Sequence, residues 1–180
     1  MSDQEYDGVP DELESTLVSS ARRADPEAFV ARLGELGWTV ATAESLTGGL
    51  VAAEIVSVSG ASRVFRGGVV AYATDLKHSL LGVEEALLAA HGPVHPRVAR
   101  QMAEGVRRAT AEGDVPADVG IATTGVAGPL ASDGHPVGTV VIAVSTPLGS
   151  RVETLALSGD RSRIRRQTTE RALRLAMDAL

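Results

Sequence analysis

Lys77 is the only lysine in the chain, among sixteen arginines, and its neighbours point to a chemical role. Arginine keeps its proton in proteins, whereas a lysine in a desolvated site can act as a base. Tyr72 lies five residues before Lys77, and its hydroxyl could orient or relay a proton. A surface lysine left over in an arginine-rich chain would explain the count equally well. The functional interpretation therefore depends on what accompanies Lys77.

A second candidate is Ser45, in the stretch 44–49 that follows a predicted strand. A serine on a strand-to-helix turn can present its hydroxyl at the sheet edge, where the next helix's amides can hold an oxyanion or a phosphate. The alternative is an ordinary helix cap, a serine or threonine followed by glycines. The stretch matches neither a nucleoside-triphosphate loop nor the Gly-x-Ser-x-Gly turn of hydrolases.

Lys77 also permits two other interpretations. Short-chain dehydrogenases pair tyrosine and lysine at a spacing of four with a Gly-x-Gly-x-x-Gly loop. Here the spacing is five and the loop is absent, so that interpretation fails. Thr74 forms Thr-x-x-Lys with Lys77 and is a competing nucleophile, although a helix N-cap is the simpler explanation.

A second small-residue loop, residues 123–129, lets backbone amides approach a ligand closely, although a tight strand-to-helix turn would look the same. Together with the stretch 44–49 it outlines a pocket for a compact, phosphorylated molecule. Arg161 is a candidate anion or subunit contact, and the remaining arginines up to Arg174 are predicted to form a solvated helix face. The four histidines have no metal-ligand spacing: His78, His91, His95 and His135.

Alternating apolar runs and turn signals predict the elements that position these residues. Strands are predicted at 38–43, 67–72 and 119–123, followed by a strand pair at 138–145 and 151–157. Helices are predicted at 10–24, 26–36, 50–58, after 74, at 96–112 and from 160 to the C-terminus. This order implies a layered α/β fold with a mixed sheet. Sites in such folds form at the carboxyl ends of strands, where the three candidate segments lie.

Composition narrows the class of protein. Six of the acidic residues precede the first basic residue, and the rest of the chain is balanced, so no electrostatic case for nucleic-acid binding exists. Cysteine is absent, and no apolar run approaches the roughly 20 residues of a membrane span. We expect a disordered acidic leader at 1–10, one domain at 11–180, and a cytoplasmic location without membrane contact.

Several motifs occur in a fixed order and carry a family resemblance. They are Thr-Ala-Glu-Ser-Leu-Thr-Gly-Gly at 42–49, Arg-Gly-Gly-Val-Val-Ala-Tyr at 66–72 followed by Lys77, Thr-Gly-Val-Ala-Gly-Pro at 124–129, Pro-Val-Gly-Thr-Val at 136–140 and Ser-Gly-Asp-Arg at 158–161. Over residues 26–180 the chain resembles the CinA C-terminal domain family, the nicotinamide-nucleotide amidohydrolases (NMN deamidases). The resemblance implies a three-layer α/β/α sandwich with a mixed, largely parallel sheet.

The resemblance also implies a reaction. It is the hydrolysis of nicotinamide mononucleotide to nicotinate mononucleotide and ammonia, in pyridine nucleotide salvage, by a homo-oligomer without a metal or organic cofactor. Ser45 would attack the carboxamide carbon, Lys77 would be its base, and Tyr72 would assist. Amides near Thr47, Gly48 and Gly49 would form the oxyanion hole. The implied substrate-binding residues are Thr42, Glu44, Thr47, Gly48, Gly49, Thr124, Gly125, Ala127, Gly128 and Arg161.

Three departures from the family pattern bear on activity. The family usually has cysteine where this chain has Leu46, so activity here requires Ser45. Residues 130–135 replace a glycine-rich segment that ends in lysine, which affects substrate affinity or identity if that loop shapes the pocket. Thr74 stands where asparagine is usual, a tolerable change. The alternative to an enzyme is a catalytically silent nucleotide-binding or regulatory module with the same fold.

Overall fold

The computed structural model describes residues 25–180 of the chain. The acidic leader predicted at 1–10 and the helix predicted at 10–24 lie outside these described residues. Within residues 25–180, no helix is both long and apolar enough to cross a membrane.

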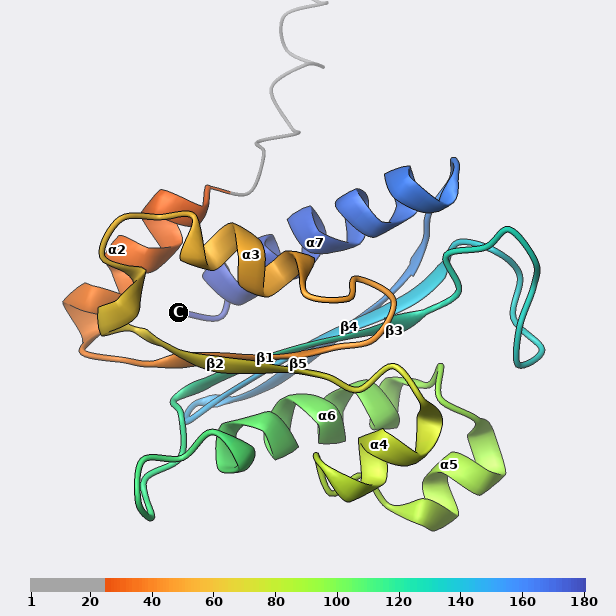
Figure 1. Cartoon of the computed structure of the whole chain (residues 1–180), viewed down its shortest axis with the longest axis horizontal. Helices are drawn as coiled ribbons and strands as arrows, with labels where there is room; N and C mark the ends of the chain where they lie inside the picture. The colour runs from red at the N-terminus through yellow and green to blue at the C-terminus, as the bar shows by residue number, and fades with distance from the viewer. Residues whose placement is uncertain (1–24) are drawn as a thin grey trace, which may run out of the picture.

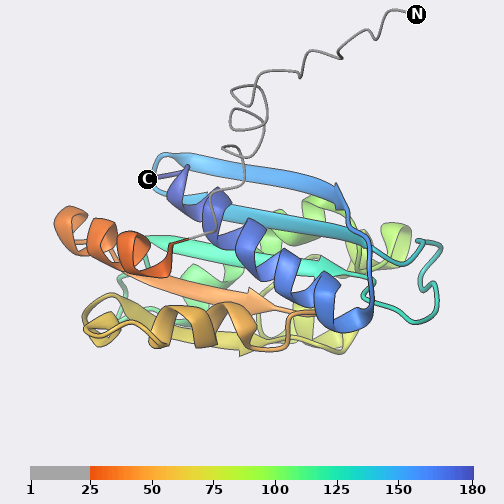
Figure 2. The ribbon, with the colours of Figure 1, turned by 90° about the horizontal axis from the view of Figure 1, so that it is seen from above.

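Five strands form one mixed sheet in the order β2-β1-β3-β4-β5. Their bounds are Val40–Glu44 (β1), Phe65–Val70 (β2), Val119–Gly125 (β3), Thr139–Thr146 (β4) and Gly149–Ala156 (β5). β1 is parallel to both β2 and β3, whereas β4 and β5 are antiparallel to their neighbours. Figure 2 shows this order from above, with β5 at one edge and β2 at the other. The predicted mixed sheet is confirmed, and its parallel part is the trio of strands that leads to the candidate site.

Helices cover both faces of the sheet, as Figure 1 shows. One layer contains α2 (Pro26–Leu36), α3 (Leu50–Val56) and α7 (Arg161–Met177). The other contains α4 (Thr74–Ser79), α5 (Glu85–His91) and α6 (Pro96–Ala109). The three-layer α/β/α architecture expected from the resemblance is therefore confirmed.

Each layer has its own apolar core. Against α2, α3 and α7 the core includes Phe29, Leu33, Ile55, Ile142 and Ile164. Against α4, α5 and α6 it includes Leu81, Val98, Met102, Ala122 and Val141. All five residues of β1 are buried, because a central parallel strand is covered on both faces. The carboxyl end of this strand is thus a rigid support for the residue that follows it, Ser45.

Some element bounds differ from those predicted. The second strand was predicted to end with Tyr72, but it ends at Val70, so Tyr72 lies just beyond the strand. Two short elements were not predicted, the 3-10 helix at Ala61–Arg63 and α5. Both are too short to show a clear helical period, and neither has a side-chain N-cap hydrogen bond that would mark its start.

Candidate functional site

Ser45 and Lys77 come together at the carboxyl ends of β1 and β2. Lys77 Nζ donates a hydrogen bond of 3.2 Å to Ser45 Oγ and one of 2.7 Å to the Ala71 carbonyl. The Lys77 side chain is 1% exposed, although it lies in the middle of the short helix α4. The two residues predicted to be nucleophile and base are therefore in direct contact.

The environment of Lys77 shifts its protonation equilibrium toward the neutral form. Burial lowers the pKa of Lys77 from its ordinary value of 10.5 to about 8, and the carboxylates of Asp133 and Asp75 oppose part of this shift. A lysine with such a pKa is partly unprotonated near neutral pH and can accept a proton. The Ala71 carbonyl fixes the amine, and this leaves its lone pair available to the serine hydroxyl.

Ser45 is held in place by the neighbouring strand and by its own turn. Its backbone N–H donates to the Thr123 carbonyl of β3 at 3.0 Å, which extends the pairing of β1 and β3 by one residue. Its carbonyl accepts from the Gly48 N–H at 3.1 Å, which closes the turn. The serine hydroxyl thus sits on a fixed backbone at the sheet edge.

A pocket of about 200 Å³ surrounds the pair. Eight of the predicted site residues line it: Ser45, Tyr72, Lys77, Thr124, Gly125, Ala127, Gly128 and Arg161. Leu130, Ser132 and Asp133 also line it, so the stretch 130–135 that departs from the family pattern forms part of the wall. A larger hollow of about 720 Å³ lies beside α2, near Trp38, but contains none of these residues.

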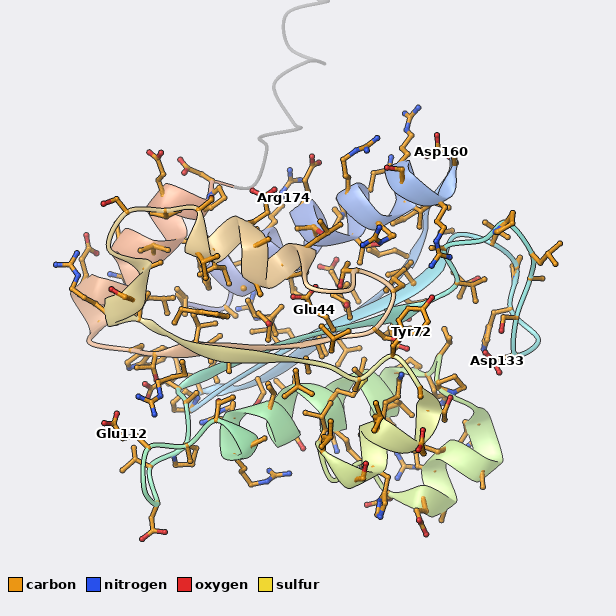
Figure 3. All side chains as sticks on the ribbon, viewed as in Figure 1. Glu44, Tyr72, Glu112, Asp133, Asp160 and Arg174 are labelled. Carbon is orange, nitrogen blue, oxygen red and sulfur yellow. The ribbon has the colours of Figure 1, made fainter. Side chains whose placement is uncertain are left out.

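Arg161 connects two sides of the pocket. Its Nη1 donates to the Gly128 carbonyl at 2.7 Å, and its Nη2 donates to Tyr72 Oη at 2.9 Å. Tyr72 itself is 59% exposed, and its hydroxyl accepts the hydrogen bond from Arg161. Figure 3 places Tyr72 at the end of the sheet from which the loop carrying Asp133 extends. The structure therefore ties Tyr72 to a guanidinium at the pocket mouth, whereas the sequence interpretation linked it to Lys77.

The other five predicted substrate-binding residues do not line the pocket. Thr42 is buried in β1 beside Gly68 and Ala52, on the face covered by α3. Thr47 is also buried, and its hydroxyl shares a 2.7 Å hydrogen bond with that of Thr123. The structure does not bring these two threonines to the contact between Ser45 and Lys77.

The remaining three residues organise the start of α3. The Glu44 carboxylate accepts hydrogen bonds from the N–H groups of Gly49 (2.9 Å), Val51 (3.1 Å) and Ala52 (2.8 Å). Figure 3 shows Glu44 between the sheet and this helix. Because Gly48 and Gly49 give their N–H groups to Ser45 and Glu44, these amides are not available for the predicted oxyanion hole. Their role here is to shape the turn at residues 45–49, between β1 and α3, which we call the serine turn.

We predict that Glu44→Gln lowers the free energy of unfolding by about 2–4 kcal/mol, because the amide loses charge and places an N–H group against backbone donors. The melting temperature should fall by several degrees, measured by thermal unfolding followed by circular dichroism. Glu54→Gln, on the exposed side of α3, is the matched control and should change it by less than about 0.5 kcal/mol. Equal melting temperatures for both variants would rule out the capping role.

Arg165 was missed by the sequence interpretation, which assigned it to a solvated helix face. Its Nε donates to the Leu46 carbonyl at 2.9 Å and its Nη2 to the Thr47 carbonyl at 2.7 Å, so it holds the serine turn from α7. The signal that could have found it is its spacing of four from Arg161, which puts both arginines on one helix face. Asp133 was missed as well, because its sequence neighbourhood is that of an ordinary loop.

The glycines of the 124–128 loop have structural reasons to be glycine. At Gly125 (φ 155°) a Cβ would lie 2.6 Å from the Thr139 carbonyl oxygen, and at Gly128 (φ 86°) it would lie 2.8 Å from Val137 Cγ1. Thr124 Oγ1 donates to the Pro93 carbonyl at 2.8 Å. The residues of this loop are therefore small because they must pack against the segment that follows, and this packing is independent of any ligand contact. In residues 25–180, no group of three His, Cys, Asp or Glu side chains is placed to hold a metal ion.

Comparisons with known proteins agree on one family. The family model of the CinA C-terminal domain matches residues 24–180. A CinA-like protein of Frankia casuarinae is 44% identical over 170 residues, which are 94% of this chain and 35% of that protein. A CinA-like protein of Anaeromyxobacter dehalogenans (strain 2CP-C) is 49% identical over 156 residues, 86% of this chain and 37% of that protein. The chain thus spans about a third of the length of these curated relatives.

Solved structures of the same superfamily share the fold. A CinA superfamily protein from Escherichia coli superposes with a TM-score of 0.79 at 29% identity, covering 86% of this chain and 88% of that one. One from Enterobacter cloacae gives a TM-score of 0.80 at 26% identity, covering 100% of this chain and 99% of that one. With the ordered motifs, the family model and the fold in agreement, the chain belongs to the CinA C-terminal domain family.

Proposed function

We propose that this protein hydrolyses the carboxamide of nicotinamide mononucleotide to give nicotinate mononucleotide and ammonia. The observation that carries the proposal is the 3.2 Å contact between Lys77 Nζ and Ser45 Oγ, with the lysine buried and its pKa lowered to about 8. A hydroxyl becomes a competent nucleophile when a base within hydrogen-bond reach takes its proton. The substrate itself comes from the family resemblance, and the pocket supplies the chemistry that such a substrate needs.

In the first half of the reaction, neutral Lys77 takes the proton of Ser45 Oγ as this oxygen attacks the carboxamide carbon. The ammonium form of Lys77 then gives that proton to the amide nitrogen, which leaves as ammonia and generates a serine ester. The same amine serves as base and acid because it returns the proton that it took. Leu46 lines the pocket next to Ser45, and we propose its backbone N–H as a donor to the oxyanion.

In the second half, water attacks the ester. Lys77 takes a proton from the water and returns it to Ser45 Oγ as the ester bond breaks, and the carboxylic acid of nicotinate mononucleotide leaves and gives its proton to the solvent. The net change is one water consumed and one ammonia released, with the enzyme unchanged. Lys77 is thus required in both halves.

Two further features support the proposal. Leu46 stands where the family usually has cysteine, and its side chain is buried in the apolar core, so Ser45 is the candidate nucleophile of this turn. Arg161 presents a guanidinium at the pocket mouth, where it could bind the substrate's phosphate. Tyr72 would position that guanidinium through its 2.9 Å hydrogen bond.

The proposal predicts a pH dependence set by Lys77. Since the neutral amine is the active form, kcat/KM should rise about tenfold per pH unit below pH 8 and level off above it. Asp75 raises the pKa of Lys77, so Asp75→Asn should move the rise to lower pH. The measurement is ammonia release from nicotinamide mononucleotide between pH 5.5 and about 9.5 for both proteins. A rate that is flat across this range, or a rise unmoved in the variant, would contradict the assignment of Lys77 as the base.

A further inference from the structure

Asp133 lies on the hairpin between β3 and β4 and lines the catalytic pocket with Ser45, Lys77 and Arg161. The other charged side chains that line this pocket, Lys77 and Arg161, are basic. Figure 3 shows Asp133 near the tip of the hairpin, on the side of the sheet covered by α4 and α5. The pocket therefore combines one carboxylate with two basic groups, and the carboxylate has no part in the mechanism proposed above.

The hairpin fixes the position of this carboxylate. Residues Ser132 and His135 pair across a two-residue turn, with N–H to carbonyl distances of 3.2 and 2.9 Å. Asp133 and Gly134 have φ values of 54° and 76°, the conformation of a tight two-residue hairpin turn that favours Asp-Gly. Ser132 Oγ donates to Asp133 Oδ2 at 2.8 Å. The side chain is thus oriented by its own turn.

The electrostatic effect of Asp133 reaches the reacting groups. Of the two carboxylates that raise the pKa of Lys77, Asp133 has the larger effect, although Asp75 is on the same short helix as Lys77. Asp133 also lines the pocket, whereas Asp75 does not, so the charge of Asp133 lies nearer to a substrate ring whose carboxamide contacts Ser45. In nicotinamide mononucleotide that ring carries a positive charge, because its nitrogen is bonded to the ribose.

Resting on the proposed function, we infer that Asp133 is a specificity-determining residue whose carboxylate favours nucleotides with a cationic pyridinium ring over those with a neutral ring. The attraction is electrostatic and needs no direct hydrogen bond, since a quaternary ring nitrogen has no N–H group to donate. Asp133 belongs to the stretch 130–135 that departs from the family pattern.

The test compares two ligands that differ only in ring charge. Nicotinamide mononucleotide has a pyridinium ring, whereas benzamide riboside 5′-monophosphate has the same carboxamide, ribose and phosphate on a neutral ring. Because the proposed reaction would consume both ligands, every protein in this binding measurement carries Ser45→Ala in addition. The dissociation constants are measured by titration calorimetry at low ionic strength, and their ratio cancels the contribution of the phosphate. We expect the wild type to prefer the cationic ring and Asp133→Asn to reduce the preference about threefold to fivefold. Raising the salt concentration should reduce the wild-type preference in the same direction.

The variants are chosen so that folding does not confuse the result. Asparagine tolerates a positive φ, and its side-chain oxygen can still accept from Ser132, so Asp133→Asn should keep the turn. Asp75→Asn is the matched control: it also removes a carboxylate that acts on Lys77, but Asp75 is not among the residues that line the pocket. We expect this control to keep the wild-type ratio.

Binding and turnover are read separately. The inference is supported if the ratio of dissociation constants falls in Asp133→Asn and is unchanged in Asp75→Asn. This holds even if the wild type releases no ammonia, because that result would contradict only the proposed hydrolysis. Equal affinity of the wild type for both ligands would overturn the inference. So would an unchanged ratio in Asp133→Asn, an equal fall in both variants, or no measurable binding of either ligand.

Discussion

Replacing Lys77 with arginine should reduce ammonia release from nicotinamide mononucleotide by about 10²- to 10⁴-fold while leaving nucleotide binding within a few fold of the wild type. Arginine keeps a positive charge but cannot give up its proton, so the variant removes the base without removing the charge. The comparison is of kcat from ammonia release and of the dissociation constant from calorimetry. Unchanged turnover in a correctly folded variant would exclude Lys77 as the base.

A second substitution covers the case in which the longer guanidinium does not fit. Lys77 is 1% exposed, and methionine fills a similar space without an amine. Lys77→Met should therefore fold, as judged by its melting temperature, and should lose turnover to the same extent as Lys77→Arg. If Lys77→Met kept wild-type turnover, the contact of 3.2 Å with Ser45 would have to be purely structural.

Ser45→Ala should lose still more activity, on the order of 10³- to 10⁶-fold, because the acyl-enzyme can no longer form. Thr74→Ala is the discriminating control. The sequence suggests Thr74 as a competing nucleophile, and Thr74 also lines the same pocket. Thr74 begins α4, whereas the hydroxyl in contact with Lys77 is that of Ser45. We expect Thr74→Ala to keep at least about a tenth of the wild-type turnover.

Trapping gives the serine prediction an independent readout. Hydroxylamine attacks an ester far more readily than an amide, so wild type turning over in its presence should yield the hydroxamate of nicotinate mononucleotide. Ser45→Ala should yield none. Hydroxamate production by Ser45→Ala at the wild-type rate would show that another residue forms the acyl intermediate, and a large loss in Thr74→Ala would identify that residue as Thr74.

Sequence patterns predicted that Ser45 and Lys77 lie together, because their placement follows from local rules. Ser45 comes directly after a buried strand, and Lys77 sits in a short helix after the next strand along the chain. Since β1 and β2 are parallel neighbours, their carboxyl ends meet at one edge of the sheet. The order of strands and helices was enough to predict that these residues meet.

The interior of the serine turn could not be predicted in the same way. A glycine-rich turn before a helix looks the same whether its amides bind a ligand or cap the helix. The three hydrogen bonds that the Glu44 carboxylate accepts show that it caps the start of α3. They form because the Glu44 side chain folds back over its own turn. Sequence alone placed Glu44 and Gly49 in the substrate site because it had no measure of this competition.

Contacts between distant segments were also out of reach. Arg165 binds the Thr47 carbonyl across 118 residues of sequence, and Arg161 meets Tyr72 across 89. The spacing of four puts Arg161 and Arg165 on one face of α7, but it does not encode which distant groups they meet, because those contacts depend on how α7 crosses the sheet above the parallel strands. Figure 2 shows that crossing, with α7 lying obliquely over the strands.

The most direct measurement of the central claim is ammonia release from nicotinamide mononucleotide by the purified wild-type protein, with Ser45→Ala and Lys77→Arg assayed beside it. We predict that the wild type releases ammonia and forms an equal amount of nicotinate mononucleotide, and that both variants bind the nucleotide but release almost none. Wild-type protein that binds the nucleotide without releasing ammonia would contradict the proposed hydrolysis and favour a silent nucleotide-binding module.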